Sequence, residues 1–191
     1  MSILLVLLGF LLQTPAPAAP AQPPPGNPVA VIDTSAGPIT VELYKDRAPV
    51  SVENFLQYAR DGFYTGTIFH RVVPGYVIQG GGYTKELVEK ETRPPIQNEA
   101  TNGLRNQRMT LAMARKRNLR SATSQFYINL VDNPALDFRG LSPDDFGYAV
   151  FGRVLEGMDV VAKIASSPTA TKDGMENVPV TPVLIKSVTI R

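Results

Sequence analysis

A chain of 191 residues with 43% hydrophobic and 19% charged side chains is long enough for one domain with a full hydrophobic core. Its formal net charge of +2 is too small to favour nucleic-acid binding, which calls for a clustered basic face. The lack of cysteine excludes disulfides, a thiol nucleophile and thiolate metal ligands, and the single histidine argues against a zinc or iron centre. We therefore expect neither a metal nor a cofactor.

The N-terminus predicts export. Its first 32 residues carry no charged side chain, and an apolar run from Ile3 to Leu12 matches the hydrophobic region of a secretory signal. That run is too short to span a bilayer, which takes roughly 20 residues. Two Ala-x-Ala steps follow, so we expect a signal peptide over residues 1–21 that is cleaved after Ala21. No Lys or Arg precedes the apolar run, which leaves open a misplaced start codon or a segment kept as a weak anchor.

Seven prolines between Pro15 and Pro28 indicate an extended tether, because such a stretch forms neither helix nor ladder. We therefore assign residues 22–28 to a Pro-rich linker and residues 29–191 to one folded domain. The expected location of that domain is the periplasm or the exterior of the cell.

The folded domain begins with a predicted antiparallel hairpin, formed by residues 29–33 and 39–44 around a Ser-Ala-Gly-Pro turn. Pro49 suits the first turn of a helix, and Gly62 is a plausible stop. Between them, one apolar face repeats with helical spacing and predicts a helix at 49–60. That face consists of Val52, Phe55, Leu56 and Ala59.

Short strand-like runs follow, and the chain ends with a second predicted helix at 157–165 and an alternating strand at 180–190. The runs lie at 67–73, 76–79, 109–114, 125–130 and 149–154. Seven or eight strands with two helices indicate a mostly β fold. Because closure removes exposed sheet edges, we expect a closed antiparallel β-barrel.

The predicted strand at 125–130 has two different faces. Every second residue from Phe126 to Leu130 is apolar and should pack in the core. The other face carries Gln125, Tyr127 and Asn129, which suits a groove that binds a peptide backbone. A solvent-facing strand surface explains the same pattern.

The stretch from Phe69 to Gly82 contains the only histidine, His70, next to Arg71. The turn at Pro74-Gly75 should bring Gln79 back alongside this pair. The plain alternatives are a core histidine satisfied by the backbone and an arginine in a surface ion pair. The three glycines that follow do not fit a phosphate-binding loop and suit a flexible turn.

The densest basic run, Arg115-Lys116-Arg117 with Arg120, is typical of a solvated loop.

Four blocks in this order resemble the signature blocks of the cyclophilin family of peptidyl-prolyl isomerases. The first is Phe-His-Arg-Val-Val-Pro-Gly-Tyr-Val-Ile-Gln-Gly-Gly at 69–81. The others are Ala112–Arg115, Ser124–Asn129 and Phe146–Val154, with a helix opening at Gly157–Asp159. The resemblance runs from about Val29 to Arg191 and is greatest to bacterial members, many of them periplasmic. It implies an eight-stranded antiparallel barrel capped by two helices.

The resemblance also implies an activity and the residues that carry it. Arg71 would be catalytic, by donating to the proline nitrogen of a twisted peptide bond, and Gln79 would orient Arg71 and bond the substrate backbone. The proline ring would lie among Tyr76, Val77, Tyr127 and Leu136. Gln125 and the backbone of Ala114 and Arg115 would hold the peptide, and His70 would line the site without a proton-transfer task.

Three positions depart from the best-known eukaryotic pattern. Tyr127 stands where phenylalanine is usual and adds a hydroxyl to the edge of the proline pocket. Ala135 stands where a tryptophan contributes strongly to cyclosporin binding, and Tyr148 where a histidine is common. Weak cyclosporin binding is therefore expected.

The expected partners are proline-containing polypeptides and unfolded client proteins, bound by a monomer without nucleic acid or a stable membrane span. Two other classes stay open. One is a binding module of the same fold, a proline-peptide chaperone or scaffold with little turnover. The other is a barrel that carries a small apolar ligand in an enclosed cavity.

Overall fold

The computed structural model describes residues 26–191, which form an eight-stranded antiparallel sheet, two α-helices and a separate two-stranded hairpin. The order of strands in the large sheet is β10-β1-β2-β7-β5-β6-β4-β3. Its strands are β1 (Val29–Thr34), β2 (Gly37–Leu43), β3 (Arg71–Val73), β4 (Val77–Gly80), β5 (Thr110–Met113), β6 (Phe126–Asn129), β7 (Val150–Glu156) and β10 (Ile185–Ile190). The helices are α1 (Pro49–Arg60) and α2 (Met158–Ala165), with short 3₁₀ turns η1 (Ala100–Asn102) and η2 (Pro134–Leu136).

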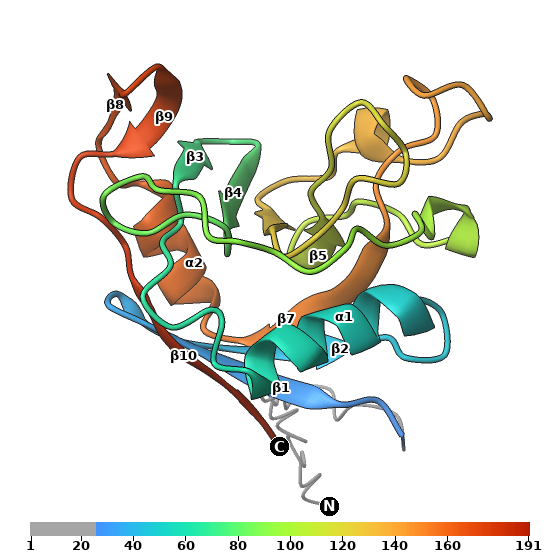
Figure 1. Ribbon diagram of the computed structural model, residues 1–191, viewed down its shortest axis with the longest axis horizontal. Coiled ribbons are helices and arrows are strands. Elements are labelled where there is room, and N and C mark those ends of the chain that lie inside the picture. The colour runs from blue at the N-terminus through green and yellow to red at the C-terminus, as the bar shows by residue number, and fades with distance from the viewer. Residues whose placement is uncertain (1–25) are drawn as a thin grey trace, which may run out of the picture.

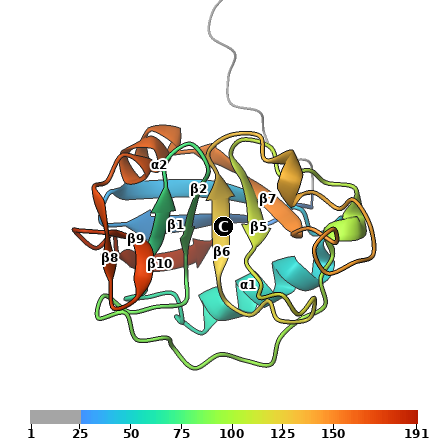
Figure 2. The ribbon, with the colours of Figure 1, turned by 90° about the horizontal axis from the view of Figure 1, so that it is seen from above.

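The large sheet curves into a half-barrel. Figure 1 shows β1, β2 and β10 on one side and β3, β4 and β5 on the other, with α2 toward one end and α1 toward the other. Seen from above in Figure 2, β5 and β6 lie side by side, as their antiparallel pairing requires. The predicted eight-stranded antiparallel sheet with two helices is confirmed.

The sheet is not a closed barrel, because β10 and β3 are its two ends and share no ladder. β3 is only three residues long. The segment before β3 is joined to the segment before β10 only by an isolated bridge between Ile68 and Leu184 and by a few backbone bonds. One of these runs from the N–H of Phe69 to the carbonyl of Val183. The predicted strand at 67–73 is therefore shortened to its last three residues.

The first hairpin and both helices lie where the sequence predicts them. The hydroxyl of Thr34 accepts hydrogen bonds from the N–H groups of Ala36 and Gly37, which fixes the turn between β1 and β2. α1 has no side-chain cap of its own. Instead, the carboxylate of Glu99 accepts bonds from the N–H groups of Val50 and Ser51 and from the Ser51 hydroxyl, so a distant loop caps this helix.

The C-terminal region differs from the prediction. A hairpin of β8 (Thr169–Lys172) and β9 (Met175–Pro179) precedes the last strand, which begins at Ile185 rather than at residue 180. The N–H of Val180 still bonds to Pro168, so residue 180 belongs to the end of this hairpin. Asp173 and Gly174 both have positive φ, the geometry of a tight hairpin turn.

The interior of the half-barrel is filled by apolar side chains. Phe55 of α1 meets Phe126 and Phe151 there, each fully buried. α1 packs against β7 and β10, and α2 packs against β2. This filled core takes the place of the enclosed cavity that a carrier of a small apolar ligand requires. Within residues 26–191, no helix combines the length and apolar character needed to cross a membrane.

Candidate active site

The register of five strands aligns one row of side chains across the outer face of the sheet. Arg71 on β3 lies opposite Gln79 on β4, which lies opposite Tyr127 on β6. Tyr127 lies opposite Ala112 on β5, and Ala112 opposite Val150 on β7. Because side chains alternate along a strand, the neighbours of these residues point into the core. The row therefore places a guanidinium and an amide at one end of an apolar surface.

Two amides hold the polar end of this row. The side-chain nitrogen of Gln79 donates to Gln125 Oε1 over 3.0 Å, and Arg71 Nη1 approaches Gln79 Oε1 at 3.5 Å. The Arg71 guanidinium carbon lies 6.0 Å from the centre of the Tyr76 ring. Within the described part of the chain no carboxylate forms an ion pair with Arg71, which rules out the surface ion pair considered above. The positive charge of Arg71 is thus available to a ligand bound on this outer face of the sheet.

A small pocket of about 260 Å³ opens at this row. It brings together nine of the predicted site residues: Arg71, Tyr76, Val77, Gln79, Ala114, Arg115, Tyr127, Leu136 and Tyr148. Six of these nine residues are apolar or aromatic, and Arg71, Gln79 and Arg115 supply the polar part of the wall. The volume and lining suit a proline ring.

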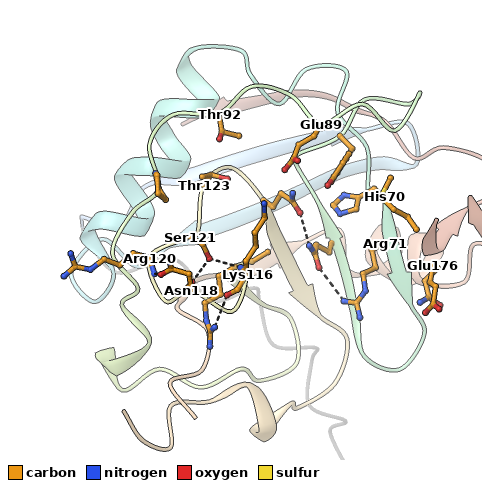
Figure 3. A pocket seen from close by; sticks show the side chains of 18 residues that line it. His70, Arg71, Glu89, Thr92, Lys116, Asn118, Arg120, Ser121, Thr123 and Glu176 are labelled. Atoms are coloured by element: carbon orange, nitrogen blue, oxygen red, sulfur yellow. Dashed lines mark hydrogen bonds between the residues drawn. The ribbon is translucent and has the colours of Figure 1, made fainter. Parts of the chain in front are cut away.

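A larger hollow of about 760 Å³ adjoins the small pocket and shares four of its residues, Arg71, Gln79, Ala114 and Arg115. Two further predicted residues, His70 and Gln125, line it. Figure 3 shows Arg120 and Glu176 on opposite sides of this hollow, with the Arg71–Gln79–Gln125 bonds between them. An extended peptide that places a proline in the small pocket can continue along this hollow.

The sequence prediction missed much of the wall of the larger hollow. Met175, Glu176 and Asn177 come from the β8–β9 hairpin, which was not predicted from the sequence. The remaining unpredicted residues lie in the loops at 83–95 and 116–123. The Asp173-Gly174 step was the available signal for the hairpin. The loop residues carry no pattern that indicates where they fold.

Ala135 is exposed and lines neither hollow, unlike its neighbour Leu136. The structure therefore does not bring this predicted site residue together with the others. A methyl group is too short to reach the pocket from η2.

His70 is buried, with only 5% of its surface exposed, and its ring packs 4.6 Å from that of Tyr83. Among the described residues no hydrogen bond reaches its Nδ1 atom, so the backbone, through a bond with Ile68, satisfies this core histidine only in part. Burial, followed by the positive charge of Arg71, lowers the pKa of His70 from 6.5 to about 4. The imidazole is therefore neutral at pH 7.

Because the pKa of His70 is lowered by folding, we expect acid to destabilise the folded protein through protonation of His70. Between pH 6.5 and 4, His70 is protonated in the unfolded chain but stays neutral in the folded protein. The contribution of His70 to the free energy of unfolding therefore falls as the pH falls. From pH 7 to pH 5 this amounts to about 2 kcal/mol. Urea unfolding at both pH values should show that loss in the wild type and a smaller one in His70→Gln. Equal losses would show that His70 does not titrate this way.

The strand face carrying Tyr127 and Asn129 is not a solvent-facing surface. Tyr127 is 4% exposed and Asn129 is fully buried. The Tyr127 hydroxyl donates to Asn106 Oδ1 over 2.7 Å, and Asn106 does not line the small pocket. The extra hydroxyl thus points behind the pocket wall and not to the edge of the proline pocket, where the resemblance put it.

Arg115 is more than part of a solvated loop. Its guanidinium donates to the carbonyls of Gly147, Pro143 and Lys116, and it lies 4.6 Å from the centre of the Tyr148 ring. It thereby joins two loops and covers one wall of the small pocket. Arg117, by contrast, forms only an exposed ion pair with Asp144, as expected for a solvated loop.

The site offers hydrogen bonds, the positive charges of Arg71 and Arg115, and a pocket with an apolar and aromatic part. The serine, lysine and carboxylate side chains near it are not paired into a nucleophile and base. Among residues 26–191, no three His, Asp or Glu side chains gather where a metal ion could bind. The arrangement suits binding a proline-containing peptide and stabilising a distorted state of it.

Comparisons with known proteins agree with this geometry. The sequence profile of the family described as cyclophilin type peptidyl-prolyl cis-trans isomerase matches residues 29–190. A peptidyl-prolyl cis-trans isomerase of Acinetobacter baylyi is 50% identical over 99% of this chain and 95% of its own. Peptidyl-prolyl cis-trans isomerase B of Escherichia coli is also 50% identical, over 82% of this chain and 96% of its own.

A solved structure of the same family also has this fold. A crystal structure of a cyclophilin type peptidyl-prolyl cis-trans isomerase from Cryptosporidium parvum superposes with a TM-score of 0.71, covering 86% of this chain and 98% of that one at 24% identity. At that identity the likeness supports the fold alone. With the profile and the bacterial relatives, it places the chain in the cyclophilin-type peptidyl-prolyl cis-trans isomerase family.

Proposed function

We infer that this protein is a peptidyl-prolyl cis-trans isomerase that accelerates rotation about X-Pro bonds without a covalent intermediate. The observation that carries this function is the placement of Arg71 beside a pocket large enough for a proline ring, in which six of the nine lining residues are apolar or aromatic. Relatives of similar length and about half-identical sequence bear the same activity in their names. A peptide isomerisation assay on the purified chain tests it, with acceleration of cis–trans exchange as the expected result.

The reaction needs no bond to break. Rotation about the peptide C–N bond crosses a barrier of roughly 18–20 kcal/mol because resonance gives that bond double-bond character. In the twisted state the proline nitrogen becomes pyramidal and regains its lone pair. A donor aimed at that lone pair stabilises the twisted state more than either planar isomer.

Arg71 is the residue proposed for this donation, since a guanidinium is always charged and carries several N–H groups. Gln79 is held by its bond to Gln125 and keeps the guanidinium directed along the row. Its contact with Arg71 is long, at 3.5 Å, so Gln79 Oε1 can instead accept a hydrogen bond from the substrate backbone. His70 stays neutral beside them and takes no proton.

The remaining walls would hold the substrate. Tyr76, Val77, Tyr127 and Leu136 enclose the proline ring, and Tyr148 closes one side. The Ala114 N–H already donates to Gln125 O, so the peptide would meet other backbone groups of Ala114 and Arg115. A low-turnover binding module of the same fold rests on Tyr127 and Ala135, and it loses the first of these supports because the Tyr127 hydroxyl points away from the pocket.

Cyclosporin should bind weakly. Ala135 is exposed on η2 and offers only a methyl group where the resemblance implies a tryptophan. Calorimetric titration of the wild type should give a dissociation constant well above the nanomolar range, and Ala135→Trp should tighten it. Nanomolar binding by the unchanged protein would contradict this prediction.

We also propose that the protein is exported to the periplasm or beyond, as a monomer that assists the folding of proline-containing clients. The uncharged N-terminus with its two Ala-x-Ala steps supports export, and these residues lie outside the described part of the chain. N-terminal sequencing of the protein from the periplasmic fraction should begin at Gln22, after a signal peptide of residues 1–21 and ahead of a linker at 22–28. An intact N-terminus on a membrane-associated protein would instead indicate a retained anchor.

A further inference from the structure

A buried network of amides lies directly behind the small pocket and is centred on Asn106. Asn106 is 2% exposed and does not line the pocket itself. Its backbone N–H donates to the Asp137 carboxylate over 2.7 Å, and its carbonyl accepts from the N–H of Asn133 over 2.8 Å. The backbone of Asn106 is therefore held on both sides of its Cα atom, independently of the contacts of its side chain.

The side chain of Asn106 reaches three walls of the pocket. Its Oδ1 atom accepts from the Tyr127 hydroxyl over 2.7 Å. Its Nδ2 atom donates to the carbonyl of Leu136 over 3.0 Å and approaches the carbonyl of Tyr148 at 3.4 Å and the carboxylate of Asp137 at 3.2 Å. Burial raises the pKa of Tyr127 well above its usual value, so its hydroxyl keeps the proton that this bond needs.

The network continues to the fourth wall. Asn129 Nδ2 donates to Asn106 Oδ1 and to the Thr110 hydroxyl. Asn133 Nδ2 donates to Asn129 Oδ1 over 2.8 Å and to the backbone carbonyl of Tyr76 over 3.1 Å. Two amides thus connect Asn106 to the segment that carries Tyr76.

These bonds matter because the pocket walls come from separate segments. Leu136 belongs to η2 and Tyr148 to the loop before β7, so neither is held by a strand of the sheet. Their own bond, from Tyr148 N–H to Leu136 O, joins them to each other and not to β6. Asn106 supplies the connection to Tyr127 on β6. Without it, these two walls would lose their connection to Tyr127, and Tyr148 would be held only through the bonds of its neighbours Gly147 and Ala149. Binding proline would then require more ordering of the walls, which weakens binding.

We propose that Asn106 is a positioning residue for substrate, which together with the Tyr127 hydroxyl holds the walls of the proline pocket in place. The proposal rests on the isomerase function inferred above. On this proposal the proline ring stays in the pocket in the cis, trans and twisted states alike, so the pocket walls would contribute equally to binding each of them. Loss of such uniform binding lowers affinity and leaves the rate of the bound step unchanged.

The test measures affinity and bound-state rate separately, by NMR line-shape titration of a short Ala-Pro peptide with the full chain. In Tyr127→Phe, which removes one hydroxyl, we expect about fivefold weaker affinity, as for the loss of one net hydrogen bond. In Asn106→Ala we expect a loss of roughly tenfold or more, because contacts to all three walls disappear. In both variants the bound peptide should interconvert within about twofold of the wild-type rate.

Thr40→Val is the matched control for Tyr127→Phe. Thr40 is 6% exposed, and its hydroxyl donates over 3.0 Å to Glu156, which it faces between β2 and β7, and neither residue lines the pocket. It should lower the melting temperature without changing affinity. If Asn106→Ala does not fold, Tyr127→Phe and its control decide the question alone.

Unchanged affinity in Tyr127→Phe, or an equal loss in Thr40→Val, would overturn the proposal. A slower bound-state rate at unchanged affinity would also overturn it. Failure of the wild type to accelerate exchange is a different result, because it would contradict the isomerase function itself.

Discussion

Replacing Arg71 by alanine is expected to lower isomerase turnover by at least ~100-fold, the usual scale for removing a preorganised donor to a transition state. The guanidinium has no ion-pair partner in the described chain and stands at the rim of the small pocket, so the loss should fall on the bound step. A protease-coupled assay with one Ala-Pro peptide measures turnover, and calorimetric titration with the same peptide should show affinity reduced far less.

Arg71→Lys is the matched variant for this prediction. It keeps the positive charge but loses the fixed planar array of N–H donors, so its turnover should lie between the wild type and Arg71→Ala. His70→Gln changes the adjacent residue, which has no proton-transfer task, and should keep most of the activity at pH 7. Near-normal turnover in Arg71→Ala would contradict the proposal that Arg71 stabilises the twisted peptide bond.

The largest expected effect on stability comes from Phe126, on the core face of β6. Its ring is fully buried and makes edge-on contacts with Phe55, Tyr64 and Phe69 at centroid distances of 5.6, 5.7 and 6.1 Å. Phe126→Ala should therefore cost about 3–5 kcal/mol, from lost burial and the cavity left behind. Urea unfolding followed by circular dichroism measures this loss.

Phe138→Ala provides the control, since Phe138 is 38% exposed and its one aromatic contact is Phe146. It should cost less than about 1.5 kcal/mol, because much of the ring stays in water on folding. Equal losses in the two variants would contradict the placement of Phe126 at the centre of the core.

The sequence was most informative where local rules and register coincide. The Pro74-Gly75 turn fixes a short hairpin, so the pairing of Arg71 with Gln79 could be predicted from the local sequence alone. The alternation from Gln125 onward separated a core face from a functional face in the same way. Helix α1 was predicted from its apolar spacing, Pro49 and the stop at Gly62, all of them local signals.

Features that depend on distant segments could not be predicted. Glu99 caps α1 from a loop far along the chain, and no spacing rule connects the two. The direction of the Tyr127 hydroxyl depends on Asn106, which a different segment places behind the pocket. Because the strands of the β8–β9 hairpin are short and mostly polar, their alternation was too weak to predict a strand within residues 169–179.

The central claim is that a bound proline peptide bond is rotated because Arg71 stabilises its twisted state. Exchange NMR on a short Ala-Pro peptide, with the protein at a small fraction of the peptide concentration, tests this most directly. The wild type should accelerate cis–trans exchange, and Arg71→Ala should abolish the acceleration while still binding the peptide. Binding by the wild type without faster exchange would contradict the claim and indicate a binding module.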